Sequence, residues 1–224
     1  MLIVFSGLDG AGKSTQIELI LDMLRTQGKA PVYLWVRGGY TPLFNVAKSL
    51  VRRLSGGRVV PPSGRSEARS KALQQPWKRR LWLLLALLDL IFVYGIQVRW
   101  WRLRQRPVVC DRYIWDTLVD FRLNFPQERV ERWWLWLLLQ WVTPTPDAAF
   151  LLLIPVDESL RRSKLKHEPF PDAPEVLATR LAQYEALAKQ GHWQVLDGRL
   201  PITTLQQMIQ AQIGSSLKAA ARAD

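Results

Sequence analysis

Cysteine and histidine are nearly absent from this chain of 224 residues, which has one cysteine and two histidines. A single cysteine excludes an internal disulfide framework. Because Cys110 ends an apolar run, we expect a small buried hydrophobe rather than a reactive thiol. No cluster has the spacing of a zinc site. His167 and His192 have no acid or nucleophile at a suggestive spacing, which favours surface or helix-capping roles for both.

Acidic residues are also scarce, with 19 Asp and Glu against 31 Lys and Arg, and the formal net charge is +12. Such a surface favours anionic partners, among them nucleotides, nucleic acids and acidic membranes. Basic residues around a polyphosphate site are the simplest explanation, and no RNA- or DNA-binding module has its signature here. We therefore expect nucleotide substrates and no nucleic acid partner.

Neither an internal repeat nor an export signal is visible. With a single cysteine, this favours a reducing, cytoplasmic location. The length suits one α/β domain with a sizeable core. We expect that domain to cover residues 1–213, with a C-terminal tail over residues 214–224.

Short apolar runs alternate with amphipathic segments, the pattern of a parallel sheet covered by helices. The predicted strands are 2–5, 31–36, 108–111, 149–154 and 193–196. The predicted helices are 14–27, 42–54, 77–104, 116–121, 128–142, 157–165, 174–190 and 203–212. Glycine and proline predict a mobile loop over about 55–70, and prolines predict a second mobile segment over 166–174.

Eleven tryptophans are many for this length, and they gather in 77–101 and 133–141. The stretch Leu81–Ile96 is almost entirely apolar, with basic residues and tryptophans at both ends, as in a membrane interface. It is shorter than the ~20 residues that a span needs, and Asp89 interrupts it. A buried core helix or a helix–helix dimer face is favoured. Peripheral membrane contact stays open, and a span is the least favoured of these.

Residues 7–15, Gly-Leu-Asp-Gly-Ala-Gly-Lys-Ser-Thr, fit the phosphate-binding pattern G-x-x-x-x-G-K-[ST]. An apolar strand precedes them and an amphipathic helix follows, which is the context that this loop requires. Glycines let successive N–H groups point at phosphate oxygens, and the helix start adds its own. Lys13 would neutralise the β- and γ-phosphates, and the Ser14 hydroxyl would hold Mg²⁺. The predicted ATP-binding residues are Gly7, Asp9, Gly10, Ala11, Gly12, Lys13, Ser14 and Thr15. A glycine turn without a ligand is disfavoured.

Asp111-Arg112-Tyr113 closes another apolar strand, at the carboxyl edge of the sheet, where open α/β folds bind ligands. The Asp111 carboxylate could reach the Mg²⁺ held by Ser14, and Arg112 could clamp an acceptor phosphate. A simple ion pair at the strand end is the alternative.

These two motifs resemble those of the thymidylate kinase family. The acid before the second glycine of the loop is similar to that family's loop, and Asp-Arg-Tyr matches its signature after the third strand. Residues 147–162 resemble its fourth strand and lid helix, and 193–198 its fifth strand and adenine-side loop. The likeness covers most of 1–210 and implies a P-loop NTPase fold: a three-layer sandwich with a five-stranded parallel sheet flanked by helices.

The resemblance implies transfer of a phosphoryl group from ATP to a nucleoside monophosphate, dTMP above all, with Mg²⁺ as cofactor. Carried over residue by residue, Lys13 and the loop amides bind ATP, and Ser14 holds Mg²⁺ with Asp111 through water. Asp9 faces the acceptor. The acceptor-binding residues are Arg37, Arg112 and Tyr113. Arg162, on a lid over about 157–174, lies near the transferred group, with Arg161 and Lys164 as neighbours that could replace it. The implied catalytic residues are Lys13, Asp9, Arg112 and Arg162.

The chain departs from the family in its acceptor half. Arg37 meets Gly38 directly, without the usual acid and proline. Leu88-Asp89-Leu90 stands where the family carries Ala-Asp-Arg, so the arginine that reads thymine is absent, and Asp116 replaces a serine. Three readings stay open: a dTMP kinase, a P-loop kinase for a sugar or lipid-linked acceptor, and a non-catalytic nucleotide-binding module. The apolar, tryptophan-rich helices favour a homodimer.

Overall fold

The computed structural model describes residues 1–36, 73–166 and 172–220, and it divides into two compact units. The sheet unit comprises Met1–Trp35, Trp100–Pro126 and Thr145–Asp224, and the helical unit comprises Val36–Arg99 and Gln127–Pro144. The predicted helix 42–54, the predicted loop 55–70, Arg37 and His167 lie outside the described residues. The single domain over 1–213 and the lid over 157–174 stay predictions.

Five strands form one parallel sheet in the order β2-β3-β1-β4-β5. They are β1 (Leu2–Gly7), β2 (Val32–Trp35), β3 (Val108–Asp111), β4 (Ala148–Leu153) and β5 (Gln194–Asp197). Every pairing is parallel, and all residues of β1 and β3 are buried. Helices cover both faces, so these strands are apolar along their length instead of alternating. The predicted five-stranded parallel sheet is confirmed.

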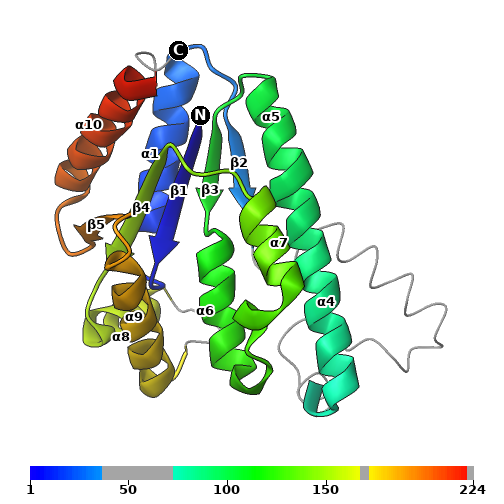
Figure 1. Ribbon diagram of the computed structural model, residues 1–224. Coiled ribbons are helices and arrows are strands. Elements are labelled where there is room, and N and C mark those ends of the chain that lie inside the picture. The colour runs from blue at the N-terminus through cyan, green and yellow to red at the C-terminus, as the bar shows by residue number, and fades with distance from the viewer. Residues whose placement is uncertain (37–72, 167–171, 221–224) are drawn as a thin grey trace. The chain divides into compact units, whose positions relative to one another are not determined.

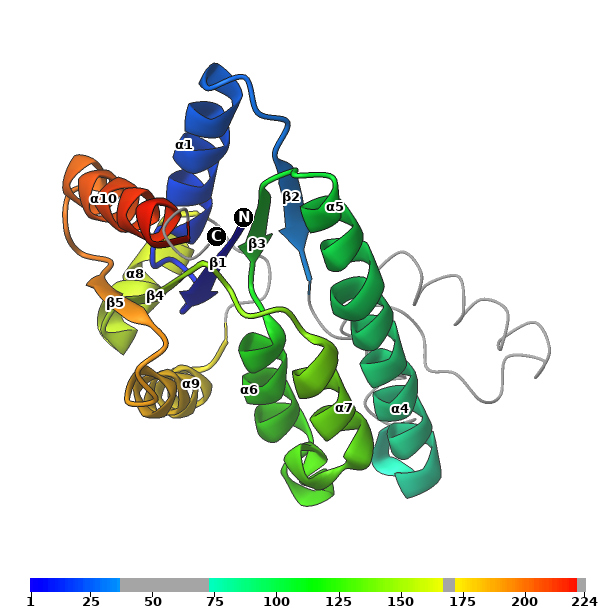
Figure 2. The ribbon, with the colours of Figure 1, turned by 45° about the horizontal axis from the view of Figure 1, so that its top comes forward.

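The helices of the sheet unit are α1 (Lys13–Thr26), α6 (Ile114–Asn124), α8 (Val156–Leu165), α9 (Pro174–Ala188) and α10 (Ile202–Ala220). Figures 1 and 2 place α1 with α10 on one face of the sheet, and α6 with α9 on the other. Between the layers, the rings of Phe5 and Phe150 stack with centroids 5.2 Å apart. The three-layer α/β sandwich predicted from the sequence is confirmed.

The helical unit is built from one long helix and a shorter partner. The long helix begins as α4 (Pro76–Phe92), becomes a π-helix at Val93–Val98 and continues as α5 (Arg99–Leu103), whose last four residues belong to the sheet unit. It packs on α7 (Trp134–Val142). A Cβ on Gly95 would lie 3.3 Å from the Val142 side chain, so glycine permits this close packing. The predicted helix over 77–104 is confirmed.

The predicted helix over 128–142 is wrong in its first half. Residues Pro126–Glu128 and Val130–Arg132 form two short 3₁₀ turns, and α7 begins only at Trp134. Glu128, within the first of these turns, is buried. Its carboxylate accepts hydrogen bonds from Arg79 Nε at 2.6 Å and Arg80 Nε at 3.0 Å. We infer that the ion pair of Glu128 with Arg79 and Arg80 determines the backbone here. The paired residues lie nearly fifty positions apart, so no local sequence pattern predicts it.

Pro76–Leu103 is the one helix in the described part of the chain that is long and apolar enough to cross a membrane. It has 28 residues, more than the apolar run suggested, and half of its most apolar stretch is buried. Core helices of soluble proteins share both properties, so length and composition alone are weak evidence for a span.

Candidate active site

The glycine-rich loop leaves β1 at Gly7 and enters α1 at Lys13, all within the sheet unit. Gly7 has a φ of 130°, and a Cβ there would lie 2.0 Å from the Leu152 carbonyl oxygen of β4. Only glycine fits this close approach between strands. Ser14 and Thr15 are exposed in the first turn of α1. The helix start thus presents free N–H groups and two hydroxyls where an anion is favoured.

Lys13 turns its ammonium group back into the loop. Nζ donates to the carbonyl oxygens of Gly7 at 3.0 Å and Leu8 at 2.7 Å, and lies 3.9 Å from Asp9 Oδ1. Burial, followed by the charge of Arg112, lowers the pKa of this ammonium to about 8. A nearby anion would therefore raise the pKa of the buried Lys13 ammonium and favour its charged form.

Arg112 sits directly after β3 in a strained backbone, with a φ of 79°. Its N–H donates to the Phe5 carbonyl oxygen at 2.8 Å, which ties it to β1. Nη2 donates to Asp9 Oδ1 at 2.5 Å, and the residue is only 5% exposed. Left-handed backbone in a non-glycine residue is uncommon and clusters at functional sites. The structure brings Asp9 and Arg112 together, although 103 residues separate them.

Asp116 organises the residues beneath this pair. Its Oδ2 accepts from Ser6 Oγ at 2.5 Å and the Tyr113 N–H at 2.8 Å, and its Oδ1 accepts from Tyr184 Oη at 2.6 Å. Arg112 Nη1 lies 3.7 Å from Oδ1 and donates to Tyr184 Oη at 3.4 Å. Asp116 is 1% exposed, and both of its carboxylate oxygens accept hydrogen bonds. It therefore helps to fix the position of the Arg112 guanidinium.

Asp111 lies at the end of β3, opposite Phe5 of β1, and so at the carboxyl edge beside the loop. Its Oδ2 accepts from Tyr33 Oη at 3.2 Å. Its Oδ1 is buried and has no hydrogen-bond partner in the described structure. Burial raises the pKa of this carboxyl, against the charges of Lys13 and Arg112, which lower it. A buried carboxylate oxygen without a donor suits a cation ligand.

Arg162, on α8, joins the phosphate loop to the loop after β5. Its Nη1 donates to the carbonyl oxygens of Gly10 at 3.0 Å and Gly198 at 2.9 Å. Hydrogen bonds from Arg161 and then Arg162 lower the pKa of Glu158 to about 2. Arg161 and Lys164 are exposed, so Arg162 is the member of this basic group that contacts the loop.

Gly198, in the loop after β5, also lies against the phosphate loop. A Cβ at this position would lie 2.6 Å from the Ala11 carbonyl oxygen and 2.8 Å from Ile154 Cγ2. Any side chain would push the two loops apart. The loop after β5 therefore forms one wall of the site.

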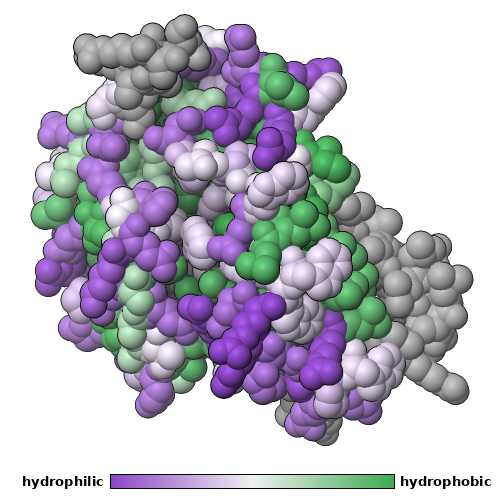
Figure 3. Space-filling model, viewed as in Figure 1, coloured by the Kyte–Doolittle hydropathy of each residue, from purple (hydrophilic) through white to green (hydrophobic). Residues whose placement is uncertain are grey.

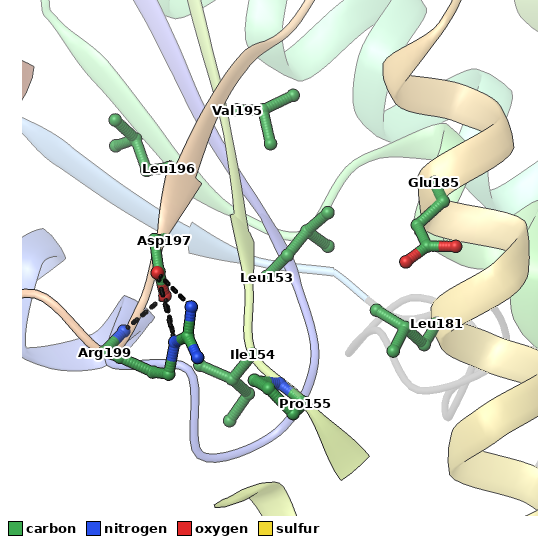
Figure 4. A pocket seen from close by; sticks show the side chains of 9 residues that line it. All are labelled: Leu153, Ile154, Pro155, Leu181, Glu185, Val195, Leu196, Asp197 and Arg199. Carbon is green, nitrogen blue, oxygen red and sulfur yellow. Dashed lines mark hydrogen bonds and ion pairs between the residues drawn. The ribbon is translucent and has the colours of Figure 1, made fainter.

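A pocket of about 350 Å³ opens beside these loops, at the ends of β4 and β5 (Figure 4). Leu153, Leu181 and Val195 give it apolar walls. Asp197 and Arg199 pair at its edge, with Arg199 Nη2 2.7 Å from Asp197 Oδ2. Its size is at the lower end for small-molecule sites.

The predicted site residues are placed unevenly. Lys13, Asp9 and Arg112 form a chain of ion pairs at the loop and Arg162 donates to the loop backbone, whereas Tyr113 is buried at the start of α6. Sequence reasoning missed the residues that support them: Ser6, Tyr33, Glu158, Ser159 and Tyr184. One signal was available, because α9 carries Arg180 and Tyr184 on its otherwise apolar buried face.

Leu88, Asp89 and Leu90, where the sequence departs from the family's Ala-Asp-Arg, lie on α4 in the helical unit. Leu90 is fully buried in α4, and Asp89 is 5% exposed. Both belong to the buried side of the helix that also contains Leu83, Ala86 and Leu87. Leu90 is thus a core residue.

A glycine-rich loop between strand and helix, at the carboxyl edge of a parallel sheet and contacted by an arginine of a later helix, is the arrangement of a P-loop nucleotide-binding protein. The thymidylate kinase family model matches residues 83–209. The chain therefore belongs to the thymidylate kinase family and is a nucleotide phosphotransferase.

Similar proteins agree with this assignment. A thymidylate kinase of Desulfotalea psychrophila is 30% identical over 162 residues, covering 72% of this chain and 67% of the relative. One from Bordetella petrii is 26% identical and covers 94% of this chain and 93% of its own length. Deoxyadenosine kinase from M. mycoides, solved with dCMP and dCDP bound, superposes with a TM-score of 0.60 at 16% identity, covering 96% of this chain and 100% of that one. This last likeness shows the shared fold.

Proposed function

We propose that this chain transfers the γ-phosphoryl group of ATP to dTMP, giving ADP and dTDP. The observation that carries the proposal is the chain of charges from the buried Lys13 through the partly exposed Asp9 to the buried Arg112 and Asp116, beside the phosphate loop. Phosphoryl transfer asks a protein mainly to position its substrates and to offset their charge. The loop holds one buried cation, Lys13, and beside it lies a second, Arg112, which pairs with Asp9 and Asp116. This arrangement can position phosphate groups and offset their charge.

Each residue has a role within this proposal. The loop N–H groups and Lys13 bind the ATP phosphates, and Arg162 offsets charge near the group in transit. Arg112 receives the acceptor phosphate, because its guanidinium is pre-oriented by Asp9 and, through Asp116, from below. Arg37 and Tyr113 are proposed as further acceptor residues from family resemblance.

The residues present fit Mg²⁺. Asp111 Oδ1 is buried without a hydrogen-bond partner among the described residues, and Ser14 offers an exposed hydroxyl in the first turn of α1. Both are oxygen ligands, which Mg²⁺ prefers. When bound, Mg²⁺ offsets the negative charge on the β- and γ-phosphate oxygens.

The test is an ATP-consumption assay with Mg²⁺ and each nucleoside monophosphate in turn, with mass spectrometry of the product. We expect dTDP from dTMP at a higher kcat/KM than for dUMP, dCMP, dAMP or dGMP. Lys13→Ala should lower this turnover by at least about 10³-fold, since it removes the buried cation. Turnover in Lys13→Ala equal to that of the parent would contradict the mechanism.

A second acceptor class has one specific observation in its favour. Leu90 is buried and apolar where the family's base-reading arginine stands, and a site without that partner discriminates bases poorly. A sugar or lipid-linked acceptor then fits as well as dTMP. The same assay separates the cases: turnover only on such an acceptor favours this second class, and ATP binding without turnover on any acceptor favours a non-catalytic module.

A further inference from the structure

Asp111 is a buried acid of the sheet unit that has one carboxylate oxygen without a donor. Figure 3 shows hydrophilic side chains spread over the surface of α8, α9 and α10, where water can satisfy them. Asp111, by contrast, is only 7% exposed at the end of β3. Its Oδ1 has no hydrogen-bond partner among the described residues. A buried polar atom in this state needs an explanation, and a bound ion is one of the few available.

The cations that lie near Asp111 are engaged elsewhere. The charges of Lys13 and Arg112 both act on the Asp111 carboxyl. Lys13 Nζ, however, donates to two carbonyl oxygens of the phosphate loop. Arg112 pairs with Asp9 and Asp116. These two side chains therefore leave Asp111 Oδ1 open to a ligand from outside the protein.

Tyr33 supplies the hydrogen bond that the other oxygen of Asp111 accepts. Its Oη donates to Asp111 Oδ2 at 3.2 Å. Strands β2 and β3 pair in parallel, with Tyr33 opposite Val109 and Trp35 opposite Asp111. Residues two apart on a strand share a face of the sheet and lie about 6.6 Å apart. Tyr33 thus stands on the same face as Asp111, one step back along the strands, and the length of its phenol spans that step.

The hydroxyl of Tyr33 approaches Asp111 from the side of β3 that faces away from the phosphate loop. Strands β2 and β1 flank β3, and β1 continues into the loop at Gly7 (Figure 2). The donor comes from β2 on one side of β3, whereas the nucleotide phosphates are expected beside β1 on the other. The Asp111 carboxylate is therefore restrained through one oxygen while the second remains available.

We propose that Tyr33 positions Asp111 so that a single carboxylate oxygen, Oδ1, is offered to Mg²⁺ or to its bound water. This inference rests on the proposed function, which assigns Mg²⁺ to Asp111 and Ser14. Mg²⁺ keeps a strict octahedral shell with several waters, whereas Ca²⁺ also accepts carboxylates through both oxygens. An acid whose Oδ2 already accepts from a phenol favours binding through one oxygen. Tyr33 is thus a positioning residue that favours Mg²⁺ over Ca²⁺.

The test measures metal binding in the absence of catalysis. The affinity of the full chain with ADP for Mn²⁺ is followed by electron paramagnetic resonance, with ADP alone as the blank, and Mg²⁺ and Ca²⁺ are added as competitors. Tyr33→Phe keeps the ring and removes only the hydroxyl. We expect Mn²⁺ and Mg²⁺ to bind on the order of tenfold more weakly, as when other partners of metal-binding carboxylates are removed. Ca²⁺ affinity should fall less, because both oxygens of Asp111 become available.

Two further variants separate positioning from a structural role. Thr179→Val is the matched control, since it removes a hydroxyl of α9 that donates to the Glu175 carbonyl oxygen at 2.8 Å. Its metal affinities should equal those of the parent. In an Asp111→Asn background, Tyr33→Phe should cause no further loss of Mn²⁺ affinity, because its effect passes through the carboxylate. Circular dichroism should show every variant folded at the temperature of the titration.

Three results would overturn the inference. If Asp111→Asn weakens Mn²⁺ binding while Tyr33→Phe binds Mn²⁺, Mg²⁺ and Ca²⁺ like the parent, the metal site stands and the role of Tyr33 is wrong. Equal losses from Tyr33→Phe in both backgrounds would make its role structural. If Asp111→Asn leaves Mn²⁺ binding unchanged, the assignment of Mg²⁺ to Asp111 is itself wrong. Because no acceptor is present, none of these results depends on whether dTMP is the substrate.

Discussion

The sheet unit and the helical unit differ in the polar groups that they bury, although the helical unit also buries an ion pair of Arg79 with Glu128. In the sheet unit, polar side chains are buried and hydrogen-bonded to one another, as Asp116 is to Ser6 and Tyr184. In the helical unit, Leu90 and its neighbours form an apolar core, and the exposed side of α4 is apolar as well. Phosphate chemistry needs fixed charges, and the sheet unit supplies them. The comparison teaches that the phosphate loop can keep its charged surroundings in a chain of this family whose helix α4 carries leucine at position 90, where the family resemblance leads one to expect arginine.

Leu90→Arg should have the largest effect, because it restores the family's arginine at a position that is fully buried here. Burying an unpaired guanidinium should lower the free energy of unfolding by about 4 kcal/mol or more, measured by urea denaturation. Leu88→Arg is the matched control: Leu88 is 45% exposed, so its replacement should change stability by at most about 0.5 kcal/mol. A stable Leu90→Arg protein with improved dTMP turnover would contradict the conclusion that position 90 belongs to the apolar core of the helical unit.

Asp116→Asn tests the buried network of the sheet unit. The amide cannot accept from Ser6, Tyr113 and Tyr184 as the carboxylate does, so unfolding should become easier by about 2–3 kcal/mol. Turnover should also fall at temperatures where the variant is folded, with the KM for the acceptor rising, because Arg112 loses its support. The control is Asp22→Asn, because Asp22 is an exposed acid on α1 paired with Arg25. It should change neither the free energy of unfolding nor the KM for the acceptor. An unchanged acceptor KM would show that Asp116 acts on stability alone.

Gly198→Ala tests the contact between the loop after β5 and the phosphate loop. Its Cβ would meet the Ala11 carbonyl oxygen at 2.6 Å, so the loops must separate. We expect the KM for ATP to rise about tenfold, the factor that corresponds to about 1.4 kcal/mol of binding free energy. Gly214→Ala in α10, where nothing lies within 4 Å of the added methyl, should leave the KM unchanged. Equal effects in the two variants would mean that this contact does not hold the loop.

The smallest effect should be a pH dependence of ATP binding. Because burial lowers the pKa of Lys13 to about 8, half of the free enzyme lacks this charge at that pH, and ATP affinity should fall by about twofold there relative to pH 7. Calorimetry in two buffers of different ionisation enthalpy should detect proton uptake on binding. In Lys13→Arg the side chain stays charged, so any remaining binding should show no such fall. An affinity independent of pH between 7 and 9 in the parent would contradict the role of this ammonium.

The same pKa has a consequence for stability with a definite sign. The folded pKa of about 8 lies below the ordinary value of 10.5, so the unfolded chain binds more protons between these two pH values. The contribution of Lys13 to stability therefore increases as pH rises through this window.

Much of the fold could be predicted because it depends on local pattern. Apolar runs such as 2–5 and 108–111 form buried strands wherever helices cover both faces of a sheet. The phosphate loop could be recognised for a related reason: Gly7 and Lys13 must stand at set intervals between strand and helix for the backbone to curl around an anion. The start of α7 could not be predicted, because Glu128 is drawn inward by Arg79, a residue far away in the sequence.

The site shows the same division. Lys13, Asp9 and Arg112 could be nominated because each occupies a fixed place in a short motif. Tyr184 and Gly198 could not be assigned their contacts, since these depend on α9 and the loop after β5 packing near the phosphate loop. Leu90 could be seen to differ from the family, but only its burial tells that the position belongs to the core.

The sequence by itself determined the parallel sheet, the phosphate loop and the scarcity of acids, because spacing along the chain and composition are local properties. Only the tertiary structure decided which charges meet: Arg112 with Asp9 and Asp116, and Arg79 with Glu128. It also decided which of the many apolar residues of α4 and α7 are left exposed. Burial and ion pairing join residues that are distant in sequence, and no local pattern encodes which partner each will find.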